Sequence, residues 1–333
     1  MNDEIAWEVA RTWLWHRRRN APVGADIWDL RFHWTTEEKR IRNAVRHREY
    51  RLSPMLVVGR QKGERLAQWS ARDALVLKWA SLHAEKVLPV HSRCEHGKGN
   101  GGCIASVHRL HHVMRNEEYK FVLRTDIRGY YRNIVKSQLW FQIQRYVHDE
   151  SVKEIIRQYL WYCVEDGGEI HTPLTGIPRG CALSPLLGAS LLYHVDVGFS
   201  SIEDIYYARY MDDFMLLTRT RWRLRQCVAK LNDHFDMRGF EQHPHKTFIG
   251  RIDRGFDWLG AAFDEHGSAG LAPRAITHHR ERYLRLYEQA YRQGLTHAEG
   301  MLKVQTYRER WLNWARRLLP ADIDAGRFSL PEL

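Results

Sequence analysis

The sequence predicts an α+β fold with a helical C-terminal part, and three observations lead to this prediction. Short apolar runs, typical of strands, are interspersed with longer amphipathic stretches, typical of helices. Two of the apolar runs lead to or surround aspartates: Tyr119–Leu123 precedes Asp126, and 205–217 contains Asp212 and Asp213. From Pro273 onward the pattern is helical and basic.

The first 90 residues predict helices around a single hairpin. The elements follow from amphipathic periodicity, from apolar runs and from the turn-forming sequence QKGE. We expect a helix at 4–19, a helix at 35–50 capped by Thr35 or Thr36, strands at Met55–Val58 and in RLAQWS, and a helix from Ala71 to about Val87.

The middle of the chain predicts a mixture of strands and helices after a loop. The Gly-rich, basic sequence HSRCEHGKGNGGC at 91–103 is typical of a turn-rich segment. Ser184 followed by Pro185 predicts a helix start, because Ser is a good cap and Pro fits the first turn. The other expected elements are a strand at Tyr119–Leu123 with Asp126 at its end, helices at 136–166 and 220–238, two short strands meeting at Asp212 and Asp213, and a hairpin in TFIGRIDRGFDWLGAAFD.

Two basic helices are expected at the C-terminal end. The first ends near Gly294, and Thr296 with Glu299 fits a capping box that begins the second. On the second helix Tyr307, Trp311 and Trp314 share one face.

Composition indicates a nucleic-acid partner. Lys plus Arg number 51 and Asp plus Glu 40, so the net charge of +11 favours a polyanion, although a basic enzyme without such a partner is the alternative. The many Trp and Tyr residues suit base stacking as well as core packing. The five scattered cysteines indicate a reducing compartment, and no run approaches the roughly 20 apolar residues of a membrane span. We therefore expect a cytoplasmic protein without a membrane partner.

Three aspartates form the candidate reactive centre. Asp212 and Asp213 alone predict only a polar turn, because Asp is common in turns. Asp126 also follows an apolar run, so neighbouring strands would bring the three carboxylates to one sheet edge. Carboxylates at such distances repel one another. Divalent cations relieve the repulsion, and oxygen ligands suit Mg²⁺, of which two can act together in phosphoryl transfer.

Five blocks, in order, resemble the reverse transcriptase family. They are RTDIRGYYRNI around Asp126, GIPRGCALSPLLGASLL from Gly176, YMDD at 210–213, HKTFIG around Lys246, and GFDWLG at 255–260. The resemblance implies a right-hand polymerase fold with fingers, palm and a short helical thumb. The implied domains are 1–120 for the N-terminal helices and fingers, 121–264 for the palm with a fingers-like helical insertion at about 136–170, and 265–333 for the thumb.

The resemblance also implies the reaction, which is RNA-directed DNA polymerisation by a nucleotidyltransferase. Asp126 and Asp212 would hold two Mg²⁺ ions, with Mn²⁺ as another candidate, and Asp213 would complete the acidic cluster. Lys246 would protonate the leaving pyrophosphate or contact the triphosphate. Tyr131 would exclude a ribose 2′-hydroxyl, although a core aromatic is the alternative.

Further contacts are implied for the nucleotide, the primer and the phosphate backbone. Arg179 departs from the family, because many relatives carry Gln there, and it adds a charge beside template or nucleotide. The implied residues are Gly176, Pro178, Arg179, Gly180, Arg65 and Arg72 for the nucleotide, Phe256, Trp258, Leu259 and Gly260 for the primer, and Lys98, Arg280, Arg282, Arg285, Arg308, Arg316 and Arg317 for phosphates.

The segment from Cys94 to His111 has two readings besides phosphate binding. HGKGNGG at 96–102 could cradle a phosphate through its amides and Lys98, or form a flexible loop. Cys94, His96, Cys103, His108 and His111 suggest zinc, although their spacing matches no standard finger.

The style of the blocks most resembles bacterial group II intron-derived enzymes. The chain ends soon after the thumb, so we expect a compact stand-alone enzyme similar to defence-associated reverse transcriptases. Its expected partners are an RNA template, a DNA product, deoxynucleoside triphosphates and a structured non-coding RNA, with a homo-oligomer or a partner protein left open. The alternatives are a maturase-type RNA-binding protein and an untemplated or protein-primed nucleotidyltransferase on the same scaffold.

Overall fold

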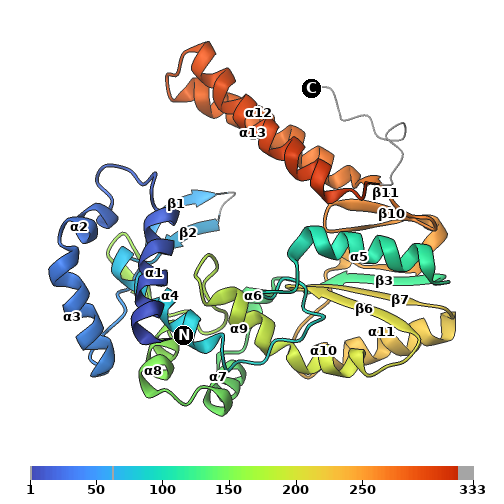
Figure 1. Ribbon diagram of the computed structural model, residues 1–333, viewed down its shortest axis with the longest axis horizontal. Coiled ribbons are helices and arrows are strands. Elements are labelled where there is room, and N and C mark those ends of the chain that lie inside the picture. Colours follow the sequence, from blue (N-terminus) through green and yellow to red (C-terminus); the bar gives the residue numbers. More distant parts are fainter. Residues whose placement is uncertain (1, 62–63, 322–333) are drawn as a thin grey trace. The chain divides into compact units, whose positions relative to one another are not determined.

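The computed structural model describes residues 2–61 and 64–321, apart from the side chains of residues 60–66. The fold is α+β, as the sequence predicts. Internal contacts divide the chain into a first unit of residues 1–90, 129–194 and 238–240, and a second unit of residues 91–128, 195–237 and 241–333. Figure 1 shows the elements of both units. No described helix is long and apolar enough to cross a membrane.

The first unit combines helices with a small sheet of order β2-β1-β4-β5. Its helices are α1 (Asp3–Arg17), α2 (Asp26–Phe32), α3 (Trp34–Arg46), α4 (Ala71–Ala84), α6 (Tyr130–Asn133), α7 (Lys136–Tyr146), α8 (Glu150–Leu160) and α9 (Ser184–Leu191). Its strands are β1 (Met55–Gln61), β2 (Glu64–Gln68), β4 (Val164–Asp166) and β5 (Glu169–His171). Helix α4 is the centre of this unit, because most of its residues are buried and Trp79 stacks on Trp7 of α1 at 5.1 Å.

The second unit is built on an antiparallel sheet of order β6-β7-β3-β8. Its strands are β3 (Phe121–Asp126), β6 (Ile205–Tyr210), β7 (Asp213–Thr218), β8 (Phe248–Arg251), β9 (Phe256–Trp258), β10 (Ala261–Asp264) and β11 (Gly267–Leu271). Its helices are α5 (Gly102–Asn116), α11 (Arg221–Asp236), α12 (Pro273–Arg292), α13 (His297–Leu318) and the short η1 (Pro244–Lys246) and η2 (Ile252–Arg254), while α10 (Tyr193–Ser200) crosses from the first unit into the second.

Both faces of this sheet are covered, because its central strands are apolar on both sides. Val122, Met215 and Leu217 point into a core shared with α5, β9–β11 and α13. On the opposite face Phe214 packs edge-on against Phe235 of α11, and Tyr207 stacks on Phe199 of α10. In Figure 1 the sheet accordingly lies between α5 and the pair α10 and α11. The absence of a solvated face on these strands explains why 121–123 of β3 and 214–217 of β7 are continuous apolar runs.

Helices α12 and α13 form an antiparallel hairpin. The ring of His279 stacks on Trp311 at 3.8 Å, and Ala290 lies against Gly300 near the connecting turn. The predicted capping box is confirmed, since the Thr296 and Glu299 side chains each bind the other's backbone amide. Trp311 and Trp314 pack inward as expected.

Two predicted helix caps are wrong. Helix α3 begins at Trp34 rather than at Thr35 or Thr36, because His33 both ends α2 and precedes α3, leaving no residue for a side-chain cap. Ser184 is the first residue of α9 rather than its cap, and its hydroxyl donates to the Pro178 carbonyl at 2.7 Å.

Two predicted elements also have different bounds in the structure. The region 136–166 is not one helical stretch but α7, α8 and strand β4. In TFIGRIDRGFDWLGAAFD, β8 joins β3, and only β9 and β10 form the hairpin.

Candidate polymerase active site

Strand pairing in the second unit brings two of the predicted aspartates face to face. Asp126 is the last residue of β3 and Asp213 the first of β7, and the two are direct partners in the antiparallel register. Directly opposed residues have Cβ atoms about 4.5–5.5 Å apart. The buried runs behind them fix this register, because a slip by one residue would exchange the two covered faces, so that side chains packed on α5 would face α11 instead.

The third aspartate lies on the turn that joins β6 to β7. Tyr210 pairs with Asp213, so Met211 and Asp212 form a two-residue turn. Met211 has a φ of 55°. This left-handed conformation costs about 1–2 kcal/mol in a residue with a Cβ atom. The Asp212 carbonyl accepts a hydrogen bond from the Ile127 amide at 3.1 Å, which ties the turn to the end of β3.

The three carboxylates influence one another electrostatically. Burial, together with the negative charges of Asp126 and Asp212, raises the pKa of Asp213 to about 7, against the opposing effects of Arg124 and Lys246. Arg124 itself is paired with Asp257 at 2.8 Å. Such crowding of acids is what the sequence predicts for this edge, and it favours binding of a cation.

Lys246 reaches this centre from η1. Its ammonium nitrogen donates to Oδ2 of Asp126 at 2.5 Å. The Asp126 carbonyl also accepts from the His243 amide at 2.8 Å, so the segment holding Lys246 is bound along the end of β3. The structure therefore places the predicted general acid beside a predicted metal ligand.

The donor chemistry of these aspartates fits Mg²⁺, which prefers carboxylate oxygens and usually keeps several waters. The side chains, however, are not already arranged as a set of metal ligands. Within residues 2–61 and 64–321 no three His, Cys, Asp or Glu side chains stand close enough to form a ready-made metal site. The negative charge of Asp126 is instead balanced by Lys246. Asp126, Asp212 and Asp213 are the residues that would hold the ions.

The predicted primer-binding residues lie on the β9–β10 hairpin. Phe256 and Trp258 are buried, and the Trp258 indole donates to Ser106 of α5 at 2.8 Å. Leu259 and Gly260 form the two-residue turn, with φ of 48° and 95°. Positive φ at both positions is typical of a type I′ turn. These contacts explain the hairpin as a packed element, and its primer contact stays a prediction.

The Gly-Pro-Arg-Gly loop belongs to the first unit. Gly176 has a φ of 80°, and a Cβ atom there would lie 2.7 Å from the Arg132 carbonyl oxygen, so only glycine fits. Pro178 is buried, and its carbonyl accepts from the Tyr159 hydroxyl at 3.0 Å. Arg179 and Gly180 are exposed. The loop thus has a rigid base and presents the Arg179 side chain at its surface.

The two tyrosines after Asp126 differ. Tyr130 is buried, and its hydroxyl donates to the Gly188 carbonyl at 2.7 Å, so it is a core residue. Tyr131 is partly exposed and lies close to Gly188, where a Cβ atom would approach its ring to 3.3 Å. This agrees with a tyrosine that presents one edge outward, and the sugar-selecting role remains a prediction.

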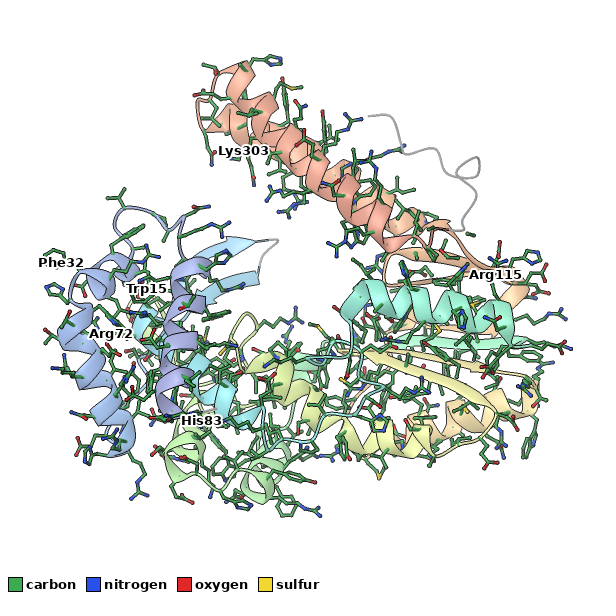
Figure 2. The ribbon with its side chains drawn as sticks, viewed as in Figure 1. Trp15, Phe32, Arg72, His83, Arg115 and Lys303 are labelled. Atoms are coloured by element: carbon green, nitrogen blue, oxygen red, sulfur yellow. The ribbon has the colours of Figure 1, made fainter. Side chains whose placement is uncertain are left out.

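Of the two arginines predicted to bind the triphosphate, the structure describes the side chain of one. Arg72, labelled in Figure 2, donates to Glu37 at 2.6 Å and to Asp29 at 2.9 Å. Its guanidinium is therefore engaged by two carboxylates in the first unit. Arg65 lies in β2, and its side chain is outside the described residues.

The histidines considered for zinc have other partners. Nδ1 of His111 accepts from the Ser268 amide of β11 at 3.0 Å, and Nε2 of His108 lies 3.1 Å from the Arg317 carbonyl of α13. Both side chains thus join α5 to neighbouring elements.

Most of the residues predicted to bind phosphates are exposed. They are Lys98 and, on α12 and α13, Arg280, Arg282, Arg308, Arg316 and Arg317, while Arg285 is half-buried.

The sequence interpretation missed Asp196 and Arg209, and it considered His96 only for zinc or phosphate and not for its contact with the aspartate turn. Arg209 and Asp196 are fully buried and form an ion pair with two contacts, of 2.7 and 2.5 Å. A signal for Asp196 and Arg209 exists in the sequence, since each is a lone Asp or Arg in an apolar run: LLYHVDVGF and IYYARYM. Lone charges of opposite sign in two buried elements indicate a buried pair, because an unpaired one would be costly.

A family model described as reverse transcriptase (RNA-dependent DNA polymerase) matches residues 83–263, which is more than half of the chain. The chain belongs to the reverse transcriptase family. Its members are nucleotidyltransferases, and the matched range contains the three aspartates and Lys246.

The other comparisons are more distant. The structure of apo telomerase from Candida tropicalis matches with 12% sequence identity and a TM-score of 0.45, over 58% of this chain and 38% of the telomerase chain. The match therefore spans well under half of that chain. A comparison with curated protein sequences found no match.

Proposed function

We propose that this reverse transcriptase family member is an RNA-directed DNA polymerase that extends a primer 3′-hydroxyl with deoxynucleotides. The observation that carries the proposal is the opposition of Asp126 and Asp213 across β3 and β7, with Asp212 on the adjoining turn. In the reaction the primer 3′-hydroxyl loses its proton to solvent and its oxygen forms a bond to the α-phosphorus. The bond from the α-phosphorus to the oxygen that bridges to the β-phosphorus breaks, and pyrophosphate leaves.

The chain's own residues have distinct parts in this proposal. Two Mg²⁺ ions, or Mn²⁺, when bound supply activation of the hydroxyl and stabilisation of the leaving oxygen. Asp126 and Asp212 would hold the ions, with Asp213 completing the acidic cluster. Lys246, whose ammonium lies against Asp126, moves to the leaving pyrophosphate and donates a proton to it. Burial, and then the charges of Asp126 and Asp212, raise the pKa of Asp213, and this supports cation binding at the aspartates because a cation would offset both effects.

The test is primer extension by the purified protein on an RNA template, with deoxynucleotides and Mg²⁺. We expect extension that the double variant Asp212→Asn, Asp213→Asn lowers by at least about a thousandfold, because the ion-holding carboxylates are lost. Circular dichroism and RNA binding should stay near wild type. Extension by the double variant at the wild-type rate would refute the mechanism. RNA binding without extension by the wild type would favour the maturase-type alternative, and products formed without template would favour untemplated synthesis.

Sugar selection is a separate part of the proposal and depends on Tyr131. Removing the ring in Tyr131→Ala should admit ribonucleotides, since the ring would otherwise meet a 2′-hydroxyl. The measurement is the ratio of kcat/KM for a deoxynucleotide to that for the matching ribonucleotide. Tyr130→Phe, which keeps the buried ring and loses only the bond to Gly188, is the control and should leave the ratio unchanged. An unchanged ratio in Tyr131→Ala would remove the selecting role.

We propose further that the template is a structured non-coding RNA and that the cellular role is antiphage defence in the cytoplasm. The support is the similarity of the sequence blocks to bacterial group II intron-derived and defence-associated enzymes. Sequencing the nucleic acids that copurify with the protein from its own host would identify template and product. Recovery of intron RNA alone would favour intron mobility instead.

A further inference from the structure

The Gly-rich segment 91–103 is bound to the edge of the sheet in the second unit. The Arg209 amide donates to the Arg93 carbonyl at 2.9 Å, and the Glu95 amide donates to the Arg209 carbonyl at 2.7 Å. Cys94 therefore forms a parallel bridge with Arg209 of β6. Because β6 is an edge strand, this pairing gives hydrogen-bond partners to backbone N–H and C=O groups that the sheet itself leaves unpaired.

The same segment is fixed internally. The Asn100 side chain donates to the carbonyls of His91 and Cys94, at 3.3 and 2.9 Å. Arg109 of α5 donates to the Asn100 carbonyl at 2.8 Å and to the buried Glu95 carboxylate at 2.9 Å. Gly101 has a φ of 90°, and a Cβ atom there would lie 2.5 Å from the Ala105 side chain. The segment therefore holds the residues that follow Cys94 at a defined place.

His96 is the residue placed in this way, and it contacts the aspartate turn. Its Nδ1 accepts the backbone N–H of Met211 at 2.8 Å. The Cys94 sulfur lies 3.4 Å from the same nitrogen. Burial raises the pKa of Cys94 to about 11, so the sulfur is a neutral thiol, which can donate to a ring nitrogen that already accepts from Met211. With two donors directed at it, Nδ1 is the unprotonated nitrogen of the ring.

Arg209 holds the other side of Met211. Its Nη1 donates to the Met211 carbonyl at 2.7 Å. The rest of the guanidinium is bound by Asp196, which also accepts the Tyr207 hydroxyl at 2.6 Å. Arginine is suited to this position because its planar group can bind a carboxylate with one edge and a carbonyl with another.

We propose that His96 and Arg209, which we call the turn brace, are positioning residues that keep Met211 left-handed and so fix the place of Asp212. The inference rests on the proposed function, because it concerns the same aspartate. The two hydrogen bonds restrain the amide before and the carbonyl after the Met211 Cα atom, and hence its φ and ψ. A non-glycine residue released from them would favour a right-handed conformation, which would reorient Asp212.

The first test compares two substitutions of His96 in the primer-extension assay. His96→Ala removes the acceptor, and we expect kcat to fall about tenfold while KM for the deoxynucleotide changes less than about twofold, the size expected for one lost hydrogen bond. His96→Asn keeps an acceptor oxygen near the position of Nδ1 and should recover to within about threefold of wild type. His112→Ala, on the exposed side of α5, is the matched control and should leave both constants unchanged.

The second test removes the strain that the brace opposes. Glycine adopts the left-handed conformation readily, so in a Met211→Gly background the further change His96→Ala should lower kcat less than about twofold. Comparing Met211→Gly with the double variant Met211→Gly, His96→Ala also tests the inference if the single variant His96→Ala does not fold. A tenfold loss in the glycine background would overturn the inference, because His96 would then act by another route.

The outcomes also separate this inference from the proposed function. Absence of extension by the wild-type protein would contradict the polymerase proposal itself. Wild-type extension together with an unchanged kcat in a folded His96→Ala variant would overturn the turn brace and leave the polymerase proposal standing. A loss in His96→Asn equal to that in His96→Ala would also overturn it, since the acceptor would then be irrelevant.

Discussion

Two turns of the second unit solve the same backbone problem in different ways. Both are two-residue turns between antiparallel strands, and each contains a left-handed residue with a side chain: Met211 between β6 and β7, and Leu259 between β9 and β10. The first is held by hydrogen bonds from His96 and Arg209. The second receives one backbone hydrogen bond, from the Ala272 amide to the Gly260 carbonyl at 2.9 Å, and is covered by an apolar side chain, because the ring of Trp314 lies where a Cβ atom of Gly260 would approach to 3.0 Å.

The difference follows from what each turn presents. The β6–β7 turn carries Asp212 beside two other carboxylates, and an apolar cover over it would deprive those charges of solvent or ions. Its support therefore comes from polar groups behind it, of which Arg209 and its partner Asp196 are fully buried. The β9–β10 turn carries no charge, so α13 can cover it directly.

The largest effect on stability should come from breaking the polar support of the first turn. Asp196→Ala leaves the Arg209 guanidinium buried without its carboxylate, and we expect the free energy of unfolding to fall by about 3–5 kcal/mol. The control is Asp253→Ala, which breaks the exposed pair with Arg251 and should cost about 0–1 kcal/mol. Denaturant titration measures both, and equal losses would contradict the distinction between buried and exposed support.

An intermediate effect is expected from crowding the second turn. Gly260→Ala introduces a Cβ atom both at a φ of 95° and against Trp314, and the two penalties together should lower the free energy of unfolding by about 2–4 kcal/mol. Gly294→Ala has a φ of 70° with nothing within 4 Å, so only the backbone penalty of about 1–2 kcal/mol applies. If both variants lost the same stability, packing by Trp314 would not be what supports this turn.

The smallest effect is a pH dependence in the helices that cover the second turn. Burial lowers the pKa of His279, and the nearby Arg308 and Arg280 lower it further. As the pH falls, the histidine therefore binds a proton in the unfolded chain before it does so in the folded protein. Its contribution to the free energy of unfolding is fully present above the ordinary histidine pKa of about 6.5 and is lost as the pH falls toward the lower pKa of the folded state. His279→Phe, which keeps a ring against Trp311, should reduce the fall in Tm between neutral and acidic pH. An identical fall in both proteins would exclude His279 as the cause.

Local sequence was enough to predict several elements and the identity of the reactive residues. The strands at the aspartates, the capping box at Thr296 and the helix from Ala71 were predicted because each depends on neighbours in the chain. The cap at Ser184 was wrong for the opposite reason, since its hydroxyl binds a carbonyl six residues earlier instead of the helix that follows. The second helix, α2, and the partner of β8 were missed, because their signals are short or lie in distant strands.

The sequence by itself determined which residues carry charge and oxygen ligands, where the apolar runs lie, and hence that Asp126 and the pair Asp212 and Asp213 lie at the ends of such runs. Only the tertiary structure decided that these strands are partners in register, that Lys246 lies against Asp126, and that His96 and Arg209 hold Met211 from both sides. The physical reason is the range of the interactions. Periodicity and caps depend on residues a few positions apart, whereas the contact from His96 to Met211 joins residues 115 positions apart, and no local pattern encodes it.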